Sequence, residues 1–301
     1  MLDLHCKDPV IVNQWHPLSS VEEVKPGVVH TTRLLDVSIS YGIDRDGTFS
    51  AWFSDGSLKA GQPFNAANLS ATLPVKHAHG HLWTCLGEPP EGLFSFDEFY
   101  EDDRRNVPTG VFGVNVSAGR AVENFLDMGH FPFVHTGILG EEPHTEVKEY
   151  QVEVSESRDE VLATQCQFYQ PQAALVSEGG AMVDYIYRVP HVNCALLYKS
   201  NPLDSSRFDV IYMFLQPVGQ EQIRAHTGMC VVDDENSHES IRYFQQTIFG
   251  QDKPILENQH PKRLPLDPRA ETPIRADKTA IAYRRWLSRK GLKYGVIPVA
   301  A

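Results

Sequence analysis

The residues best suited to chemistry lie in a single stretch, NFLDMGHFPFVH, at positions 124–135. Its two histidines, His130 and His135, could bind one metal ion, because neutral imidazole is a common metal ligand in proteins. Asp127 lies three residues before His130, and Asn124 lies three residues before Asp127. The intervening residues are largely apolar, which predicts that this polar group is buried.

Two histidines and one carboxylate form the facial triad of non-haem iron(II) sites, which leaves coordination positions open for dioxygen and substrate. Three residues could supply the carboxylate. We favour Asp252, in a late amphipathic segment, over Glu257 in the same segment and over Asp127. Asp127 is equally well placed to accept a hydrogen bond from the second ring nitrogen of a ligating histidine, which would fix its tautomer.

The spacing of the two histidines requires a distortion of the chain. Residues five positions apart on a regular helix differ by about 140° in direction. Pro132 lies between them and disfavours helical geometry at Phe131. We therefore expect a helix break at Pro132 that turns His135 toward the metal.

A second histidine cluster, KHAHGHLW, contains His77, His79 and His81. Strand alternation would place all three on one face, where they could bind a metal. No carboxylate lies at a useful distance, so a surface strand with incidental histidines is the preferred interpretation.

Residues 1–108 are predicted to form a small β domain. Short apolar segments separated by Gly, Pro and Asp turn signals predict strands at 27–30, 37–41, 48–53 and 81–86, and residues 57–75 are predicted to be an irregular loop. The charged segment EDDRRNVPTG, near Asp102, resembles a linker and sets the boundary between this domain and residues 109–301.

Residues 109–301 are predicted to form, in order, a strand, a helix, a series of strands and two further helices. A strand at 112–116 leads to a helix capped by Ser117. Alternating apolar and polar residues then predict strands at 146–154, 160–168, 182–189, 194–199, 208–217 and 221–232. Amphipathic helices follow at 235–259, capped by Asn236 or Ser237, and at 276–291. The fold class is therefore α+β, with a long helix gripped by a large antiparallel sheet.

Composition excludes several classes of protein. The 301 residues carry a formal net charge of −12, which disfavours nucleic-acid binding. No apolar run is long enough for a transmembrane helix and the N-terminus lacks a secretory pattern, so we expect a cytoplasmic protein without membrane contact. The five cysteines are widely spaced, which suggests reduced thiols.

NFLDMGHFPFVH resembles the iron motif of the Rieske non-haem iron oxygenases, in which Asn, Asp, His and His follow at this spacing. GQDKPILENQ resembles the family segment that supplies the carboxylate, and ETPIRADKTAIAYRRWL resembles the end of the O- and N-demethylase branch. WHPL and HLWTCLGEPPEG resemble the edges of the family's Rieske domain. The resemblance implies a vestigial Rieske-like β domain followed by a helix-grip, START-like catalytic domain.

The sequence departs from this family at one important point. A Rieske cluster needs a CxH pair and a CxxH pair, and the chain has neither. The resemblance then implies iron(II) held by His130, His135 and Asp252, no [2Fe-2S] cluster in this chain, and electrons that come from NADH through a reductase and a Rieske cluster on a partner. The family forms oligomers, so a homotrimer or an assembly with paralogous oxygenase subunits is expected.

The resemblance also implies an activity. Cluster-lacking members of the branch are oxygenase subunits that use dioxygen to remove an N-methyl group from a methylxanthine such as 7-methylxanthine, with release of formaldehyde. Asp127 would then connect the site with the electron donor, and Asn124 would support it. Candidates to line a pocket for a flat heterocycle are Phe168, Tyr185, Tyr187 and Phe214.

Three alternatives are also compatible with the sequence. An O-demethylase or ring hydroxylase acting on an aromatic acid would need a cation in its pocket, and Arg188 is the arginine to examine. A non-catalytic scaffold subunit would not need intact ligands. A zinc hydrolase could use the same histidines.

Overall fold

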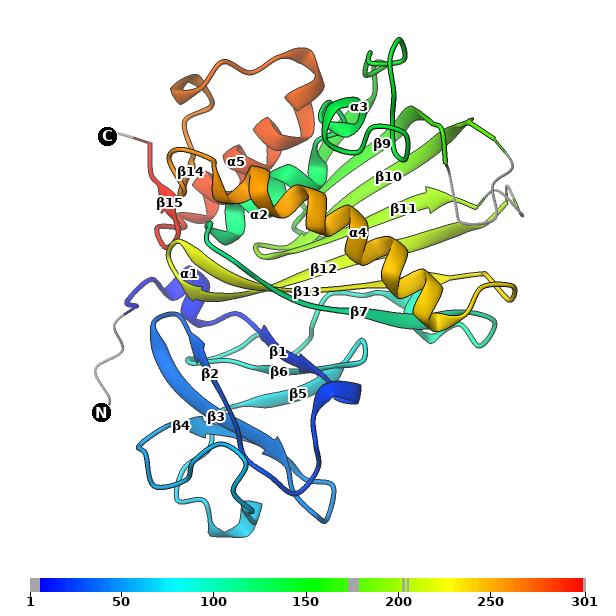
Figure 1. The fold of residues 1–301 in the computed structure, drawn as a ribbon. Coiled ribbons are helices and arrows are strands. Elements are labelled where there is room, and N and C mark those ends of the chain that lie inside the picture. The colour runs from blue at the N-terminus through cyan, green and yellow to red at the C-terminus, as the bar shows by residue number, and fades with distance from the viewer. Residues whose placement is uncertain (1–5, 173–178, 202–203, 205, 300–301) are drawn as a thin grey trace.

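The largest element of the structure is a curved antiparallel sheet. The computed structural model describes residues 6–172, 179–201, 204 and 206–299. Seven strands form the sheet (Figure 1); in spatial order they are β7 (Arg105–Val114), β13 (Gln222–Val231), β12 (Phe208–Gly219), β11 (Cys194–Ser200), β10 (Ala181–His191), β9 (Glu160–Gln170) and β8 (Gln151–Ser155).

Both faces of this sheet are buried, which explains the apolar character of its central strands. Along β12, Met213 and Leu215 point into the main core, whereas Tyr212 and Phe214 point into a second cluster on the opposite face. Alternate residues therefore belong to different layers of the molecule.

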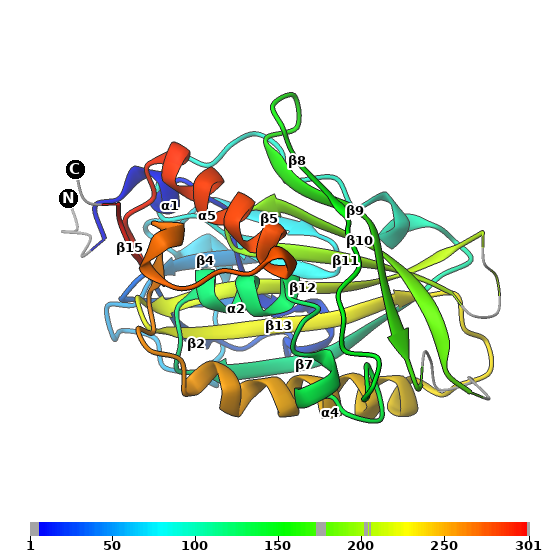
Figure 2. The same ribbon diagram turned by 90° about the horizontal axis from the view of Figure 1, so that it is seen from above.

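Helices cover the face that carries the main core (Figures 1 and 2). They are α2 (Ala118–Leu126), α4 (His238–Glu257) and α5 (Lys278–Lys290). As predicted, the Ser117 hydroxyl caps α2 and Ser237 caps α4, each by accepting a backbone N–H. Gly291 ends α5 with φ of 74°, a left-handed conformation that favours glycine. Two short helices are α1 (Pro9–Val12) and α3 (Phe131–Val134), and a small parallel pair joins β14 (Leu264–Pro265) to β15 (Val296–Ile297).

The N-terminal strands cover the opposite face of the large sheet. They form two three-stranded sheets: one of β1 (His16–Ser20), β6 (His81–Thr84) and β5 (Val75–Ala78), and one of β2 (His30–Leu34), β3 (Val37–Ile43) and β4 (Phe49–Phe53). Trp15, Trp83 and Phe96 from this part pack in one cluster with Leu196 and Phe214 of the large sheet. The two parts therefore share a buried interface.

The predicted α+β class and the helix-grip arrangement are confirmed, but several boundaries were wrong. The strand predicted at 27–30 is β2, which begins where that prediction ended, and the one predicted at 112–116 is β7, which begins at Arg105. β1 was not predicted, and β5 was expected only as part of a single surface strand through His77, His79 and His81. The presumed linker near Asp102 leads directly into β7, so position 108 lies inside a strand that pairs with β13. The prediction of a linker was wrong because it relied on the charged residues, proline and glycine of EDDRRNVPTG, which here belong to a turn and a strand.

The second histidine cluster does not share one face of a strand. The chain reverses between β5 and β6 at His79 and Gly80, whose φ values are 49° and 66°. His77 is exposed, whereas His79 and His81 are buried. His79 bonds the Phe94 carbonyl through Nε2 at 3.0 Å. The three histidines therefore do not converge on one point, and the buried rings of His79 and His81 belong to the packing of this region.

No helix in the described part of the chain is long and apolar enough to cross a membrane. The five cysteines are all free and buried.

Candidate metal centre

Both candidate histidines lie outside α2, on either side of the one-turn helix α3. α2 ends at Leu126, and Asp127 follows with an extended ψ of 119°. His130 is the N-cap and His135 the C-cap of α3, with Pro132 in its first turn, a position that proline tolerates. The expected helix break is therefore real, but it lies at Asp127, and the explanation based on Pro132 was wrong.

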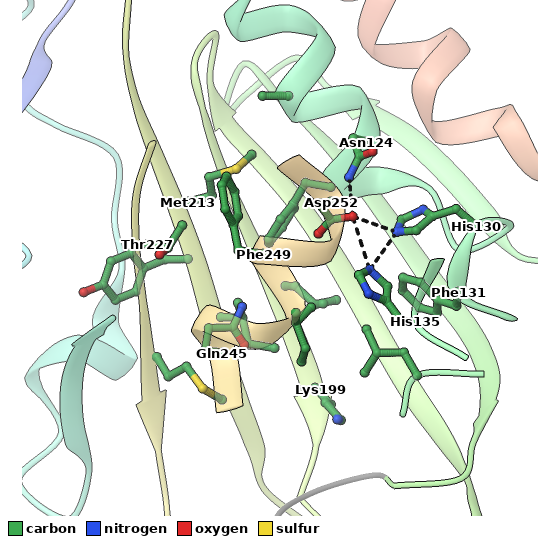
Figure 3. A pocket seen from close by; sticks show the side chains of 18 of the residues that line it. Asn124, His130, Phe131, His135, Lys199, Met213, Thr227, Gln245, Phe249 and Asp252 are labelled. Atoms are coloured by element: carbon green, nitrogen blue, oxygen red, sulfur yellow. Dashed lines mark hydrogen bonds and ion pairs between the residues drawn. The ribbon is translucent and has the colours of Figure 1, made fainter. Parts of the chain in front are cut away.

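Three ligand atoms meet at this point, from two distant segments (Figure 3). His130 Nε2 lies 3.2 Å from His135 Nε2. Asp252 Oδ1, from α4, lies 3.4 Å from His130 Nε2 and 3.2 Å from His135 Nε2. Among the residues described, these three form the only His, Cys, Asp or Glu group placed to hold a metal ion.

Neighbouring side chains orient each ligand. His130 Nδ1 donates to Asp127 Oδ2 at 3.1 Å, and His135 Nδ1 donates to Gln251 Oε1 at 2.8 Å. Asn124 Nδ2 donates to Asp252 Oδ1 at 3.0 Å. Gln251 was not predicted; its only sequence signal is its position beside Asp252.

The donor set fits a metal ion. With their Nδ1 protons donated outward, both histidines direct Nε2 lone pairs at each other and at a carboxylate oxygen. Three acceptors at 3.2–3.4 Å repel one another unless a cation lies between them. Bonds of about 2.1 Å at right angles would separate ligand atoms by about 3.0 Å, close to the observed spacing.

Burial and charge at the centre act against each other. Burial lowers the pKa of His130, but its bonds to Asp127 and Asp252 outweigh this and raise the pKa to about 9. Burial raises the pKa of Asp252, but the two histidines hold it well below its usual range. Without a metal, a proton on His130 therefore takes the place of the cation.

The other candidate carboxylates are occupied elsewhere. Glu257 Oε1 accepts from the Asn115 backbone N–H at 2.9 Å and pairs with Lys253 at 2.7 Å. Asp127 lies behind His130 and also accepts from the Gly129 N–H at 2.7 Å. Neither carboxylate faces the space between the two histidines.

A largely apolar pocket opens beside the three ligands, between α4, α2 and the large sheet (Figure 3). Its apolar walls come mainly from Phe125, Leu197, Ile211, Met213, Phe244 and Phe249. Of the residues proposed from the sequence, Tyr185 lines it. Polar lining residues that the sequence did not indicate are Gln170, Lys199, Thr227 and Gln245.

The other three pocket candidates were wrong. Phe214 points to the opposite face of the sheet, into the cluster with Trp83. Phe168 and Tyr187 point to the correct face but are covered, the first by Phe131 at 5.5 Å between ring centroids and the second by Phe125 at 6.4 Å. Sequence alternation identified residues of one face but could not show which of them α2 and α3 cover.

Arg188 does not contribute to the pocket. Its Nε pairs with the buried carboxylate of Glu160 at 2.8 Å, and its Nη1 donates to the Ser95 carbonyl at 3.1 Å. It therefore faces the N-terminal strands and cannot anchor an acid beside the triad.

Two histidines and one aspartate beside an apolar pocket, on a sheet that grips a long helix, define the class of mononuclear non-haem iron oxygenases. Comparison with known proteins identifies the family. Residues 114–291 match the model of the vanillate O-demethylase oxygenase C-terminal domain. The chain belongs to this family, among the catalytic subunits of the Rieske non-haem iron oxygenases.

One relative extends along nearly the whole chain. A probable methylxanthine N7-demethylase of Pseudomonas sp. (strain TJI-51) is 42% identical over 97% of this chain and 99% of its own length. The family has a mononuclear iron centre, which agrees with the His/His/Asp group.

Solved structures show the same fold at low identity. The methylxanthine demethylase NdmA of Pseudomonas putida CBB5, solved with caffeine, has a TM-score of 0.70 and 20% identity, and the match covers 93% of this chain and 91% of that one. Dicamba monooxygenase bound to 3,6-dichlorosalicylic acid has a TM-score of 0.74 and 16% identity, covering 93% and 98%.

Proposed function

We propose that the chain is the iron-binding oxygenase component of a methylxanthine N-demethylase that acts on an N7-methyl group, as in 7-methylxanthine. The full-length relative described as a probable methylxanthine N7-demethylase supports the substrate class and the position. The convergence of His130, His135 and Asp252 beside an apolar pocket is the observation that carries the proposal.

In this proposal His130, His135 and Asp252 hold iron(II), which supplies the activation of dioxygen. The apolar walls exclude water and hold the flat heterocycle with its methyl group toward the triad. The methyl C–H becomes C–OH, and the other oxygen atom leaves as water with two electrons and two protons from outside the chain. The resulting N-hydroxymethyl group breaks its C–N bond to give formaldehyde and the N–H product.

The electrons come from a partner in this proposal. The sequence has no CxH or CxxH pair for a Rieske cluster, so NADH is oxidised by a reductase and a partner's [2Fe-2S] cluster delivers electrons here. Asp127, whose side chain is 32% exposed, links His130 to the surface and is the proposed point of entry. The N-terminal β part, which precedes β7, would be the remnant of a cluster domain, and the assembly a homotrimer or a complex with paralogous subunits.

Metal analysis and a visible spectrum of the purified chain test this proposal. About one iron per chain without iron–sulfur absorbance is expected, together with formaldehyde release from 7-methylxanthine when a Rieske reductase and NADH are added. His130→Ala should lose the iron. Zinc in place of iron, or an iron–sulfur band from this chain alone, would refute it.

A further inference from the structure

Lys199 is a buried cation in the wall of the pocket. It lies near the end of β11, on the same face as Leu197, and its residue surface is 8% exposed. Figure 3 shows its side chain apart from the three metal ligands, with its nitrogen directed away from them. Nothing in the chemistry of the triad uses this lysine.

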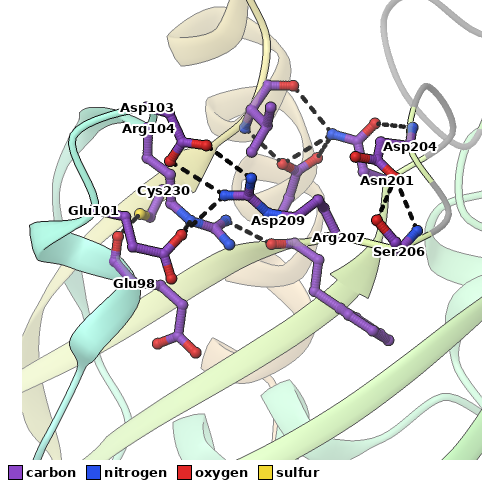
Figure 4. Close-up of polar contacts among 12 residues, drawn as sticks. Glu98, Glu101, Asp103, Arg104, Asn201, Asp204, Ser206, Arg207, Asp209 and Cys230 are labelled. Atoms are coloured by element: carbon purple, nitrogen blue, oxygen red, sulfur yellow. Dashed lines mark hydrogen bonds and ion pairs between the residues drawn. The ribbon is translucent and has the colours of Figure 1, made fainter.

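The nearest candidate counter-ion is occupied by other groups. Asp209 lies directly opposite Lys199 across the β11–β12 ladder. Its two carboxylate oxygens accept from Asn201 Nδ2 at 3.1 and 3.0 Å, and Oδ1 also accepts from the Val232 N–H at 2.9 Å (Figure 4). Among the described residues, no carboxylate lies within ion-pair distance of the Lys199 ammonium.

Two further polar groups of the pocket wall are buried without a partner in the described chain. The hydroxyl of Tyr185, which is the cross-strand neighbour of Lys199 on β10, makes no hydrogen bond. The side-chain oxygen of Gln170 on β9 also has none. Three adjacent strands thus present unsatisfied polar groups to one cavity.

Unpaired polar groups in such a place are costly. The Lys199 ammonium loses part of its hydration in this largely apolar wall and gains no hydrogen bond or ion pair from the described residues in return, and the buried Tyr185 hydroxyl and Gln170 oxygen add to this cost. Burial lowers the pKa of Lys199 to about 8, so the side chain is still mostly protonated at neutral pH. A ligand that carries acceptor oxygens would relieve this cost, whereas an entirely apolar ligand would not.

We infer that the Lys199 ammonium binds a carbonyl oxygen of the substrate and thereby sets which methyl group faces the triad. This inference rests on the proposed function and adds to it the residue that orients the substrate. When the N7-methyl group of 7-methylxanthine points to the triad, the carbonyl oxygen at C2 lies farther from that methyl group than the carbonyl oxygen at C6. Because Lys199 lies apart from the triad, the C2 oxygen is its partner.

Equilibrium binding without turnover tests this inference. The iron-loaded full chain is titrated without oxygen with 7-methylxanthine and with 7-methylhypoxanthine, which lacks the C2 oxygen. The unsubstituted chain should bind 7-methylxanthine at least about tenfold more tightly, as expected for a charged hydrogen bond in an apolar pocket. Lys199→Met should lose this discrimination, and Lys199→Arg should keep much of it. The exposed Lys59→Met is the matched control and should bind both ligands as the unsubstituted chain does.

Stability separates a binding role from a structural one. Lys199→Met removes a charge that loses part of its hydration on folding and has no ion-pair partner among the described residues, so its denaturation midpoint should equal or exceed that of the unsubstituted chain while its affinity falls. Unchanged discrimination in Lys199→Met, or a lower midpoint together with weaker binding, would overturn the inference. If Lys199→Met does not fold, loss of discrimination in Lys199→Arg would do the same.

The proposed substrate and the role of Lys199 can be refuted separately. If the unsubstituted chain binds neither of the two purines but binds an aromatic carboxylate such as vanillate through Lys199, the proposed substrate is wrong and the role of the lysine in holding a substrate oxygen stands. If the chain binds and demethylates 7-methylxanthine without regard to Lys199, only the inference fails.

Discussion

The carboxylates of Asp127 and Asp252 lie on opposite sides of the His130 ring and have different tasks. Asp252 Oδ1 faces both Nε2 atoms, whereas Asp127 accepts the proton of Nδ1. Asp127→Asn keeps an oxygen that can accept this proton, so we expect the chain to retain about one iron and to lose turnover about 10- to 100-fold. Asp252→Asn should lose the iron.

Iron content by metal analysis and formaldehyde release with a saturating electron donor measure these two effects. Asp46→Asn, on an exposed turn, is the control and should change neither. Loss of iron in Asp127→Asn with retention in Asp252→Asn would show that Asp127, and not Asp252, is the carboxylate ligand of the metal.

Lys199 also predicts a dependence of stability on pH. Its folded-state pKa of about 8 lies below the value of an unfolded lysine, so between these values the unfolded chain binds more protons than the folded chain. The contribution of Lys199 to the free energy of unfolding should therefore rise with pH above about 8, by roughly 3 kcal/mol once both states are neutral.

Denaturant unfolding of the unsubstituted chain and of Lys199→Met, at a series of pH values from 7 to 10, isolates this contribution. The difference between the two chains should favour Lys199→Met at pH 7 and shrink as the pH rises. A difference that does not vary with pH would show that folding leaves the pKa of Lys199 unchanged, so that the side chain is protonated in both states over this range.

At the scale of elements, α3 is what brings the two histidines together, and it depends on close contact with a neighbouring loop. A Cβ at Gly140 would lie 2.8 Å from the Pro132 backbone nitrogen and 3.0 Å from the Phe131 carbonyl carbon. Gly140→Ala should therefore displace α3 and weaken iron binding, by about tenfold or more if His130 and His135 no longer share one point.

Iron affinity measured by competition with a chelator is the appropriate test. Gly92→Ala is the matched control, because a Cβ there meets no atom within 4 Å and the glycine has no positive φ. Equal affinity in the two variants would show that the 136–140 loop does not hold α3 in place.

At the scale of the whole molecule, the metal centre depends on both layers that cover the large sheet. The N-terminal strands pack on the face opposite the pocket through Trp83, which is fully buried against Phe214. Ion pairs of Arg207 with Glu101 and Asp103 join the same two parts where β12 begins (Figure 4). We therefore expect one cooperative unit.

Trp83→Ala should lower the free energy of unfolding by about 3–5 kcal/mol, in a single transition, because the cavity opens between the two parts. Iron loss and unfolding should coincide when both are followed in denaturant. Tyr243→Ala, at an exposed position of α4, should change stability by no more than about 0.5 kcal/mol. Two separate transitions would show that the N-terminal strands fold independently of the metal centre.

The sequence alone determined what depends on neighbouring residues. The spacing of Asn124, Asp127, His130 and His135, the caps at Ser117 and Ser237, and the alternation along β9 to β13 are local, and the structure agrees with them. Only the tertiary structure decided which carboxylate of α4 faces the histidines, because Asp252 and Glu257 are both on one helix and the difference is made by packing. It also decided that Tyr185 and Lys199 line the pocket while Phe214 does not, since a period of two defines the faces of a strand but not what covers each face.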